Sequence, residues 1–214
     1  MKKSILIIGA GPGLSLGVAK KFASKEFTIN LISRNQENLE KIKSELNHQG
    51  IEVNYATADA GSAEQLTSAI TSLSEINSGF DAVFYNAAVL KAKDILEETS
   101  ESLTQEFTIN VANALHSLQL TREGLKQKKG AFLLTGGGLA ITPSAEYGSL
   151  SIGKAGIRSL ALQLHDRLKQ DDIYVGLLTV AGFILSDSET HSPLILADLF
   201  WKLYSERTSV EFHQ

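Results

Sequence analysis

The residue of this chain with the clearest chemical potential is Lys154, which follows Leu150-Ser151-Ile152-Gly153. In a helix, spacings of three and four residues return to one face, so Tyr147, Ser151 and Lys154 share a side. A lysine can bind hydroxyl groups and carry positive charge, and the hydroxyls of Tyr147 and Ser151 can donate a proton. Leu150, one turn before Lys154, has no proton to give. The segment therefore indicates a lysine site with Tyr147 and Ser151 as candidate proton donors on the same helix face.

A second chemical signal lies near the start of the chain, where glycines follow an apolar run. Ser4-Ile5-Leu6-Ile7-Ile8 leads into Gly9-Ala10-Gly11-Pro12-Gly13-Leu14, and a helical pattern follows. A strand, a glycine loop and a helix in this order allow backbone amides and a helix N-terminus to bind a pyrophosphate. The alternative is a plain tight turn, which glycines also serve. We expect a nucleotide site with these binding residues: Gly9, Gly11, Pro12, Gly13 and Leu14.

The end of the second predicted strand, Leu31-Ile32-Ser33-Arg34, bears on which dinucleotide binds. A free ribose 2′-hydroxyl calls for Asp or Glu at this point, whereas a 2′-phosphate calls for a cation. The planar donor fork of Arg34, with Ser33 beside it, suits a phosphate, so we expect NADP(H) in preference to NAD(H). The alternative is a solvated surface arginine.

Asp59 and Ala60 follow the third predicted strand and are further candidate contacts for the nucleotide. The Asp59 carboxylate could accept a hydrogen bond from an adenine amine. It could instead cap the helix that begins near Ser62, because Asp and Ser are the ordinary start signals of helices. The residues leave both alternatives open.

Strand-like apolar runs alternate with helical patterns along the whole chain. The strands carry several adjacent apolar residues, as in Val83-Phe84-Tyr85, which is typical of a parallel sheet covered by helices. We therefore predict an α/β fold, a single doubly wound Rossmann-like parallel sheet with helices on both faces. Residues 1–214 are expected to form one dinucleotide-binding domain, with residues 186–206 as a loop and helix on the substrate side. The predicted strands are 3–9, 27–33, 51–56, 80–85, 130–135, 173–180 and 209–212.

Composition excludes several classes of function. The net charge of −4 and pI near 5.8 argue against nucleic acid or an anionic membrane as the main partner. The chain has no cysteine, which excludes disulfides and thiolate chemistry, and its histidines show no metal-ligand spacing. The apolar run after Met1-Lys2-Lys3 stops at Gly9, too soon for a signal peptide. We expect a cytoplasmic protein that acts on a small molecule, without a metal.

Several of these motifs together resemble the short-chain dehydrogenase/reductase family between about residues 3 and 186. Gly9 and Gly13 match two of the family's three loop glycines, and Ser15 stands in place of the third. The other matching features are Asp59 after the third strand, Tyr85-Asn86-Ala87-Ala88 at the end of the fourth, Asn110 in the following helix, Lys154, and Ala181-Gly182-Phe183-Ile184-Leu185-Ser186.

The resemblance implies an NAD(P)(H)-dependent oxidoreductase with the strand order 3-2-1-4-5-6-7, assembled as a homodimer or homotetramer. It places Asn110 and Lys154 in the catalytic group, with Tyr147 as the candidate substitute acid. Against this pattern, the family's catalytic tyrosine corresponds to Leu150 and its serine to Gly137. The resemblance also implies cofactor contacts at Asn86, Ala87, Lys154, Ile184 and Ser186.

Because of those two departures, three interpretations of function follow. The protein is an oxidoreductase of an unknown carbonyl or alcohol substrate that borrows a hydroxyl from Tyr147 or Ser151. Alternatively, it binds a dinucleotide without turning it over and acts as a sensor or scaffold. In the third interpretation the fold hosts another reaction, such as an isomerisation, with acid or base supplied by Thr135, Glu146 or His191.

Overall fold

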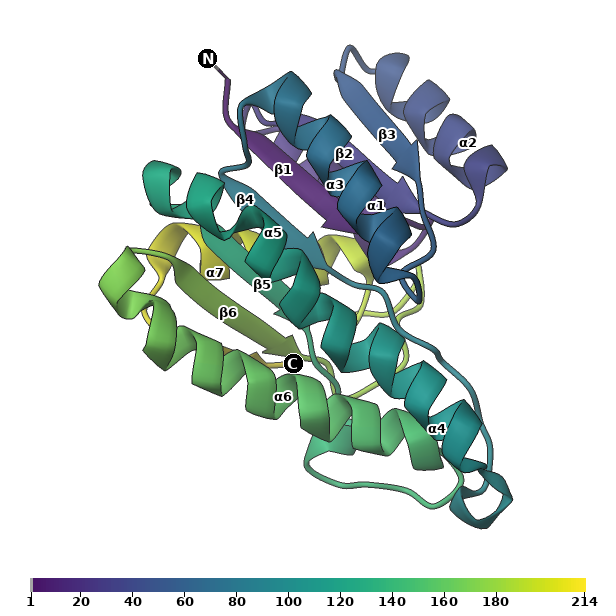
Figure 1. Ribbon diagram of the computed structural model, residues 1–214. Helices are drawn as coiled ribbons and strands as arrows, with labels where there is room; N and C mark the ends of the chain where they lie inside the picture. Colours follow the sequence, from purple (N-terminus) through teal and green to yellow (C-terminus); the bar gives the residue numbers. More distant parts are fainter. Residues whose placement is uncertain (1) are drawn as a thin grey trace.

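The computed structural model describes residues 2–214, and its centre is one seven-stranded parallel sheet (Figure 1). The strand order is β3-β2-β1-β4-β5-β6-β7, as predicted. All seven predicted strands are present, each starting or ending within a few residues of its predicted bounds. The strands are β1 (Ser4–Ile8), β2 (Thr28–Ser33), β3 (Val53–Thr57), β4 (Ala82–Tyr85), β5 (Ala131–Thr135), β6 (Tyr174–Thr179) and β7 (Glu211–His213).

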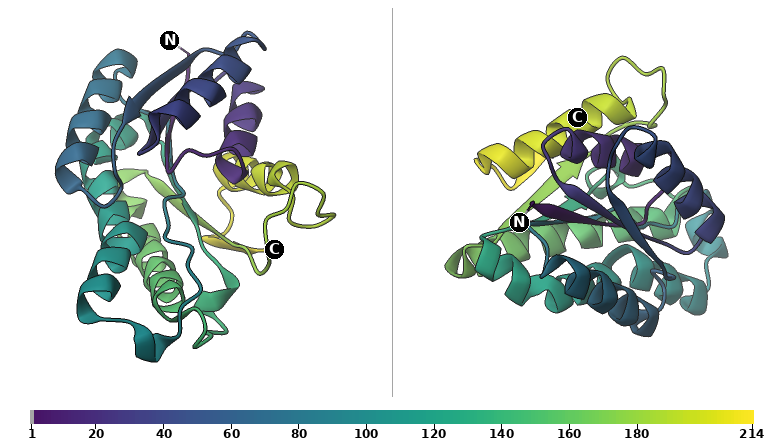
Figure 2. Two further views of the ribbon diagram at one scale, coloured as in Figure 1. Left: turned by 90° about the vertical axis from the view of Figure 1, so that its right-hand side faces the viewer. Right: turned by 90° about the horizontal axis from the view of Figure 1, so that it is seen from above.

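The helices form two layers, one on each face of the sheet (Figure 2). One layer contains α1 (Leu14–Ala23), α2 (Gln36–Asn47) and α7 (Pro193–Glu206). The other contains α3 (Ala63–Asn77), α5 (Asn113–Lys128) and α6 (Gly148–Leu168), with α4 (Ser100–Phe107) beyond the end of the sheet. The predicted helices on both faces are therefore confirmed.

The strands are buried because both of their faces are covered. Side chains of β1 alternate between the two layers: Ile5 and Ile7 pack with α1 and α7, whereas Leu6 and Ile8 pack with α3 and α5. All four are fully buried. Removal of apolar surface from water is the main favourable term in folding, at about 25 cal/mol per Å² of buried area. This two-sided burial explains the continuous apolar runs in the sequence.

Because all strands are parallel, their carboxyl ends lie at one edge of the sheet. The segments that leave β1, β4, β5 and β6 at this edge carry most of the predicted site residues. In open α/β sheets, ligands bind at this edge. The topology therefore brings together residues that are far apart in the sequence, such as Gly9 with Ala87 and Asn86 with Thr135.

Two local features differ from the sequence-based expectation. Asn110 does not lie in a regular α-helix, because Thr108–Ala112 forms a π-helical turn between α4 and α5. Such turns often occur at functional sites. The N-cap of α3 is Ser62, whose side chain accepts a hydrogen bond from Gln65 N. The proposal that Asp59 caps this helix is therefore wrong.

None of the helices within residues 2–214 has the length and apolar character that crossing a membrane requires.

Candidate active site

The glycine loop after β1 packs directly against the turn that follows β4. Gly9 has a φ of 85°, a conformation that favours glycine, and a Cβ there would overlap the backbone of Ala87. The loop then enters α1, whose first turn contains no acidic residue among the described positions 14–17. A helix N-terminus of this kind attracts anions. The structure therefore gives Gly9 a conformational reason to be glycine and leaves the start of α1 free of competing negative charge.

A short chain of hydrogen bonds links this loop to the carboxyl ends of β4 and β5. The hydroxyl of Ser15 donates to Gly9 O at 2.8 Å and accepts from Asn86 Nδ2 at 2.9 Å. Thr135 Oγ1 donates to Asn86 Oδ1 at 2.8 Å. Sequence reasoning treated Ser15 as a departure from the glycine pattern and missed its role in the network. Only the folded chain brings residues 15, 86 and 135 together.

The predicted contacts for the adenosine half of a dinucleotide lie at the ends of β2 and β3. Arg34 is exposed, and no ion pair engages it among residues 2–214. Its neighbour Asn35 caps α2 by accepting a hydrogen bond from Asn38 N. Asp59 and Ala60 are half-buried, and Asp59 Oδ1 accepts from Gly61 N at 2.8 Å. The adenine contact of Asp59 and the phosphate contact of Arg34 stay predictions.

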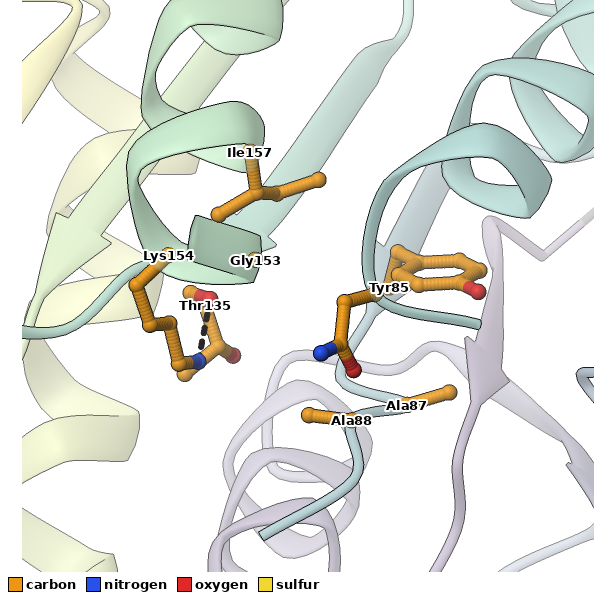
Figure 3. A pocket seen from close by; sticks show the side chains of 8 residues that line it. Tyr85, Ala87, Ala88, Thr135, Gly153, Lys154 and Ile157 are labelled. Atoms are coloured by element: carbon orange, nitrogen blue, oxygen red, sulfur yellow. Dashed lines mark hydrogen bonds between the residues drawn. The ribbon is translucent and has the colours of Figure 1, made fainter. Parts of the chain in front are cut away.

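A small cavity lies at the ends of β4 and β5, beside α6 (Figure 3). Its open volume, about 10 Å³, is enough for one water-sized group. Lys154 and Thr135 lie on one side of it and the Ala87-Ala88 turn on the other, and Lys154 Nζ donates to Thr135 O at 3.1 Å. The cavity is lined by Tyr85, Ala87, Ala88, Asn110, Thr135, Gly153, Lys154 and Ile157.

Two of the lining groups have shifted pKa values, both because of burial. Burial lowers the pKa of Lys154 to about 8, since a low-dielectric environment disfavours the charged ammonium. Burial raises the pKa of Tyr85 well above its usual value, and its hydroxyl donates to Ile109 O at 2.6 Å. Tyr85 and Ile157 were not predicted as site residues, because their apolar and aromatic types in buried elements signal only packing.

Asn110 presents an unsatisfied donor at this cavity. Its Oδ1 accepts a hydrogen bond from Val89 N at 2.8 Å, which fixes one end of the amide. Its Nδ2 is buried and has no hydrogen-bond partner in the described chain. Gly153 of α6 packs directly against this amide, since a Cβ at Gly153 would lie 2.5 Å from Asn110 Nδ2. A buried amide donor without a partner is costly, so the site is suited to an acceptor oxygen from a ligand.

The two positions where the chain departs from the family pattern lie close to Lys154. Gly137 has extended backbone, with a φ of −172°. A Cβ at Gly137 would lie 3.1–3.3 Å from Cδ, Cε and Cγ of Lys154, so the lysine stem covers this glycine. Leu150 is buried, one turn before Lys154 on α6, and it is not among the residues that line the cavity.

The other candidate acids and bases lie outside the cavity. Tyr147 is the half-buried N-cap residue of α6, bridged through its backbone to Lys93. The Ser151 hydroxyl is engaged with the backbone of Ser144, as donor to its O and acceptor from its N. The catalytic role of Tyr147 stays a prediction.

The segment after β6 is open to solvent. Ile184 and Ser186, the predicted contacts there, are both exposed, as is Glu146 before α6. His191 lies just before α7, with Nδ1 2.7 Å from Thr190 Oγ1, and its ring packs on Gly182. The structure does not bring Ile184 or Ser186 to the small cavity, and their cofactor contacts stay predictions.

The fold and the position of this site at the carboxyl ends of the strands define an α/β protein of the doubly wound class. Residues 3–192 match the sequence pattern of the short chain dehydrogenase family, so the chain belongs to that family.

Curated relatives are distant but match over most of the chain. An uncharacterized oxidoreductase of Mycobacterium tuberculosis is 26% identical over 92% of this chain and 80% of its own length. A tropinone reductase homolog of Arabidopsis thaliana is 24% identical over 80% of this chain and 65% of its own length.

Solved structures show the same fold. The L-sorbose reductase of Gluconobacter frateurii, complexed with NADPH and L-sorbose, superposes with a TM-score of 0.91 at 21% identity, covering 100% of this chain and 95% of that one. The alcohol dehydrogenase of the archaeon Thermococcus sibiricus, complexed with 5-hydroxy-NADP, gives a TM-score of 0.88 at 21% identity, with 99% and 95% covered. A Pseudomonas aeruginosa short chain oxidoreductase described as having an atypical catalytic center gives 0.89 at 15% identity, with 99% and 94% covered.

Proposed function

We propose that this protein is an NADP(H)-dependent oxidoreductase that interconverts a carbonyl compound and its alcohol. The observation that carries the proposal is the cavity at the carboxyl edge of the sheet. There Lys154 and the unpartnered Nδ2 of Asn110 lie close to the Ala87-Ala88 turn, which the glycine loop touches. The ribose hydroxyls and carboxamide of a nicotinamide nucleotide carry the acceptor oxygens that such donors lack.

The rest of the edge fits the other half of the dinucleotide. The loop from Gly9 to Leu14 opens a ten-residue helix whose N-terminus suits the pyrophosphate. Arg34, exposed at the end of β2, suits a 2′-phosphate. The structural relatives solved in complex with 5-hydroxy-NADP and with NADPH support the same cofactor class. We therefore propose NADP(H) rather than NAD(H).

When bound, this cofactor supplies or accepts a hydride. The chain's own residues would bind and orient oxygen atoms at the cavity and move a proton. Asn110 Nδ2 would donate to an oxygen there, and Lys154 would hold the ribose hydroxyls. We propose that the chain is an atypical family member, because Leu150 and Gly137 stand where a proton-donating tyrosine and an oxygen-stabilising serine are expected.

The test is calorimetric titration with NADPH, NADP, NADH and NAD, followed by an assay of NADPH oxidation with small diketones. We expect NADPH and NADP to bind more tightly than their unphosphorylated forms, and slow but measurable oxidation. Binding without any oxidation would favour a non-catalytic dinucleotide-binding protein. A protein that binds none of the four dinucleotides would contradict the proposal.

A further inference from the structure

We propose that Lys154 is itself the proton donor to the substrate carbonyl oxygen, in place of the tyrosine that this chain lacks at position 150. This inference rests on the proposed oxidoreductase function. It adds proton donation to the ribose binding proposed above, whereas a lysine at this position usually binds the cofactor ribose and tunes a neighbouring tyrosine.

The first support is the inventory of acids at the cavity. Among the eight lining residues, only Tyr85 and Lys154 can titrate. The Tyr85 hydroxyl donates to Ile109 O and points away from Lys154 (Figure 3). The hydroxyls of Tyr147 and Ser151, on the same helix, do not line the cavity. Lys154 is therefore the one lining group of the described chain that is free to give a proton to a ligand.

The second support is the position and freedom of the lysine side chain. Its stem lies over Gly137 and fills the space that a serine side chain at this position would occupy. Its Nζ uses one of three donors, toward Thr135 O at 3.1 Å. Two donors remain, and the four-carbon stem can carry them across the cavity. The glycine at 137 thus lets Lys154 lie where the oxygen-stabilising side chain would be.

The third support is the pair of hydrogen-bond donors at the cavity, the Lys154 ammonium and the Asn110 amide. The Nδ2 of Asn110 has no partner. The Thr135 hydroxyl donates to Asn86 Oδ1, and the Thr135 carbonyl already accepts from Lys154. A cavity with an ammonium and an unpaired amide donor is complementary to a developing oxyanion. One oxygen atom of a substrate fits its volume of about 10 Å³.

The groups that face Lys154 are uncharged, so burial is the only cause of its lowered pKa. Tyr85 on β4, Asn110 on the π-helical turn and Thr135 on β5 face it, and all are neutral near pH 7. Lys154 forms no ion pair within residues 2–214. Burial lowers its pKa to about 8, close to the value that suits a general acid at neutral pH.

With a reduced nicotinamide as hydride donor, a C–H bond forms at the carbonyl carbon and the C=O π pair moves to the oxygen. Lys154 gives a proton from Nζ to that oxygen, an O–H bond forms, and a neutral amine remains. The carbonyl is reduced to an alcohol, the dinucleotide is oxidised, and the amine recovers its proton from water.

The decisive variant is Lys154→Arg, because an arginine keeps the positive charge that binds ribose but does not release a proton in this pH range. Oxidation of NADPH by 2,3-hexanedione would be measured as kcat and KM, and NADPH affinity by calorimetry. We expect the Arg variant to bind NADPH within about tenfold of the unmodified protein and to lose at least about 100-fold in kcat. Lys128→Arg is the matched control, since Lys128 is also partly buried but lies at the opposite edge of the sheet, near Asp81. It should change neither quantity.

The pH dependence gives a second test. Reduction by the unmodified protein needs the ammonium form, so kcat should be constant below about pH 8 and fall tenfold per pH unit above it. A readout independent of turnover is the ¹³C chemical shift of Lys154 Cε, assigned by its loss in Lys154→Arg. Its titration should have a midpoint near 8.

The outcomes separate this inference from the proposed function. Undiminished kcat in Lys154→Arg, or a Cε midpoint near the usual lysine value, overturns the inference while leaving the oxidoreductase function intact. Loss of kcat in Tyr147→Phe with kcat retained in Lys154→Arg assigns the proton to Tyr147 instead. Absence of dinucleotide binding in the unmodified protein removes both proposals.

Discussion

Gly17 of α1 lies directly against Pro193 at the start of α7, so that a Cβ at Gly17 would lie 2.6 Å from the Pro193 carbonyl oxygen. This contact joins the helix that follows the glycine loop to the helix that follows the segment after β6. The two helices can approach so closely only because residue 17 has no side chain. The packing ties the two sides of the candidate cofactor site to each other.

The first prediction concerns this contact. Gly17→Ala should lower the free energy of unfolding by about 1–3 kcal/mol, because the obstacle is backbone and one helix must shift. The gain of about 1 kcal/mol in helix propensity offsets only part of that loss. Gly11→Ala is the control, since a Cβ at Gly11 meets open space. Urea denaturation of both variants tests the contact, and equal stability of the two would contradict it.

The second prediction concerns the preference between cofactors. Arg34→Ala should weaken NADPH binding by roughly tenfold to a hundredfold, because a charge-assisted hydrogen bond to phosphate contributes about 1.5–3 kcal/mol. NADH binding should change little. Calorimetric titration of both dinucleotides measures the effect. Equal affinities of the unmodified protein for NADPH and NADH would refute the role of Arg34.

The sheet could be predicted from the sequence to a large extent, whereas the details of the site could not. Buried parallel strands leave continuous apolar runs, and the strand order came with the family resemblance. The π-helical turn at Asn110 leaves no periodic signal, because it changes the register by a single residue. The hydrogen bonds of Ser15 and the position of Lys154 over Gly137 depend on contacts between distant elements. Sequence spacing could name these residues but could not pair them.

The third prediction restores the usual residues. Leu150→Tyr combined with Gly137→Ser should raise kcat for diketone reduction by at least roughly 10²-fold, because an oxygen-stabilising donor alone contributes about 10²–10³-fold and the tyrosine would add to the proton donation proposed for Lys154. Gly137 is extended, so a serine meets no backbone strain, and the neighbour that must shift is the flexible Lys154 side chain.

Two controls accompany that double variant. Leu150→Tyr alone separates the two positions, and addition of Lys154→Ala should abolish the gain. A double variant that folds and binds NADPH but shows no increase in kcat would mean that residue 150 does not face the reacting carbonyl.

The fourth prediction uses a carboxylate beside α4. A hydrogen bond from the Ser102 hydroxyl lowers the pKa of Glu98 to about 2, with Lys91 and Lys93 adding to the effect and burial opposing it. Because the folded pKa lies below the unfolded value, Glu98 stabilises the fold above about pH 4.5. This contribution is lost as the pH falls from there toward 2.

Glu98→Gln should therefore lower stability near pH 7 and flatten the acid limb of the stability curve. Thermal denaturation of both proteins between pH 3 and 7 measures the difference. Exposed Glu37, which forms no ion pair among residues 2–214, provides the matched control as Glu37→Gln. Parallel curves for Glu98→Gln and the unmodified protein would rule out the stabilising role of Glu98.

The last prediction concerns the cost of placing Lys154 in the site. Its pKa is about 8 in the folded protein and near the usual 10.5 when unfolded. Below pH 8 both states are protonated, and the folded state carries a charge that burial disfavours. That cost falls away as the pH rises from 8 to 10.5, where only the unfolded state still binds the proton.

Lys154→Met should thus stabilise the cofactor-free protein by about 1–2 kcal/mol at pH 7, after allowance for partial solvent access and for the lost hydrogen bond to Thr135. The advantage of the variant should shrink toward pH 10. Urea denaturation at pH 7 and pH 10 measures both quantities, with Lys128→Met as the control that loses an ion pair to Asp81 and should be destabilised. A Lys154→Met protein less stable than the unmodified one at pH 7 would show that the lysine is held by favourable contacts rather than retained for its chemistry.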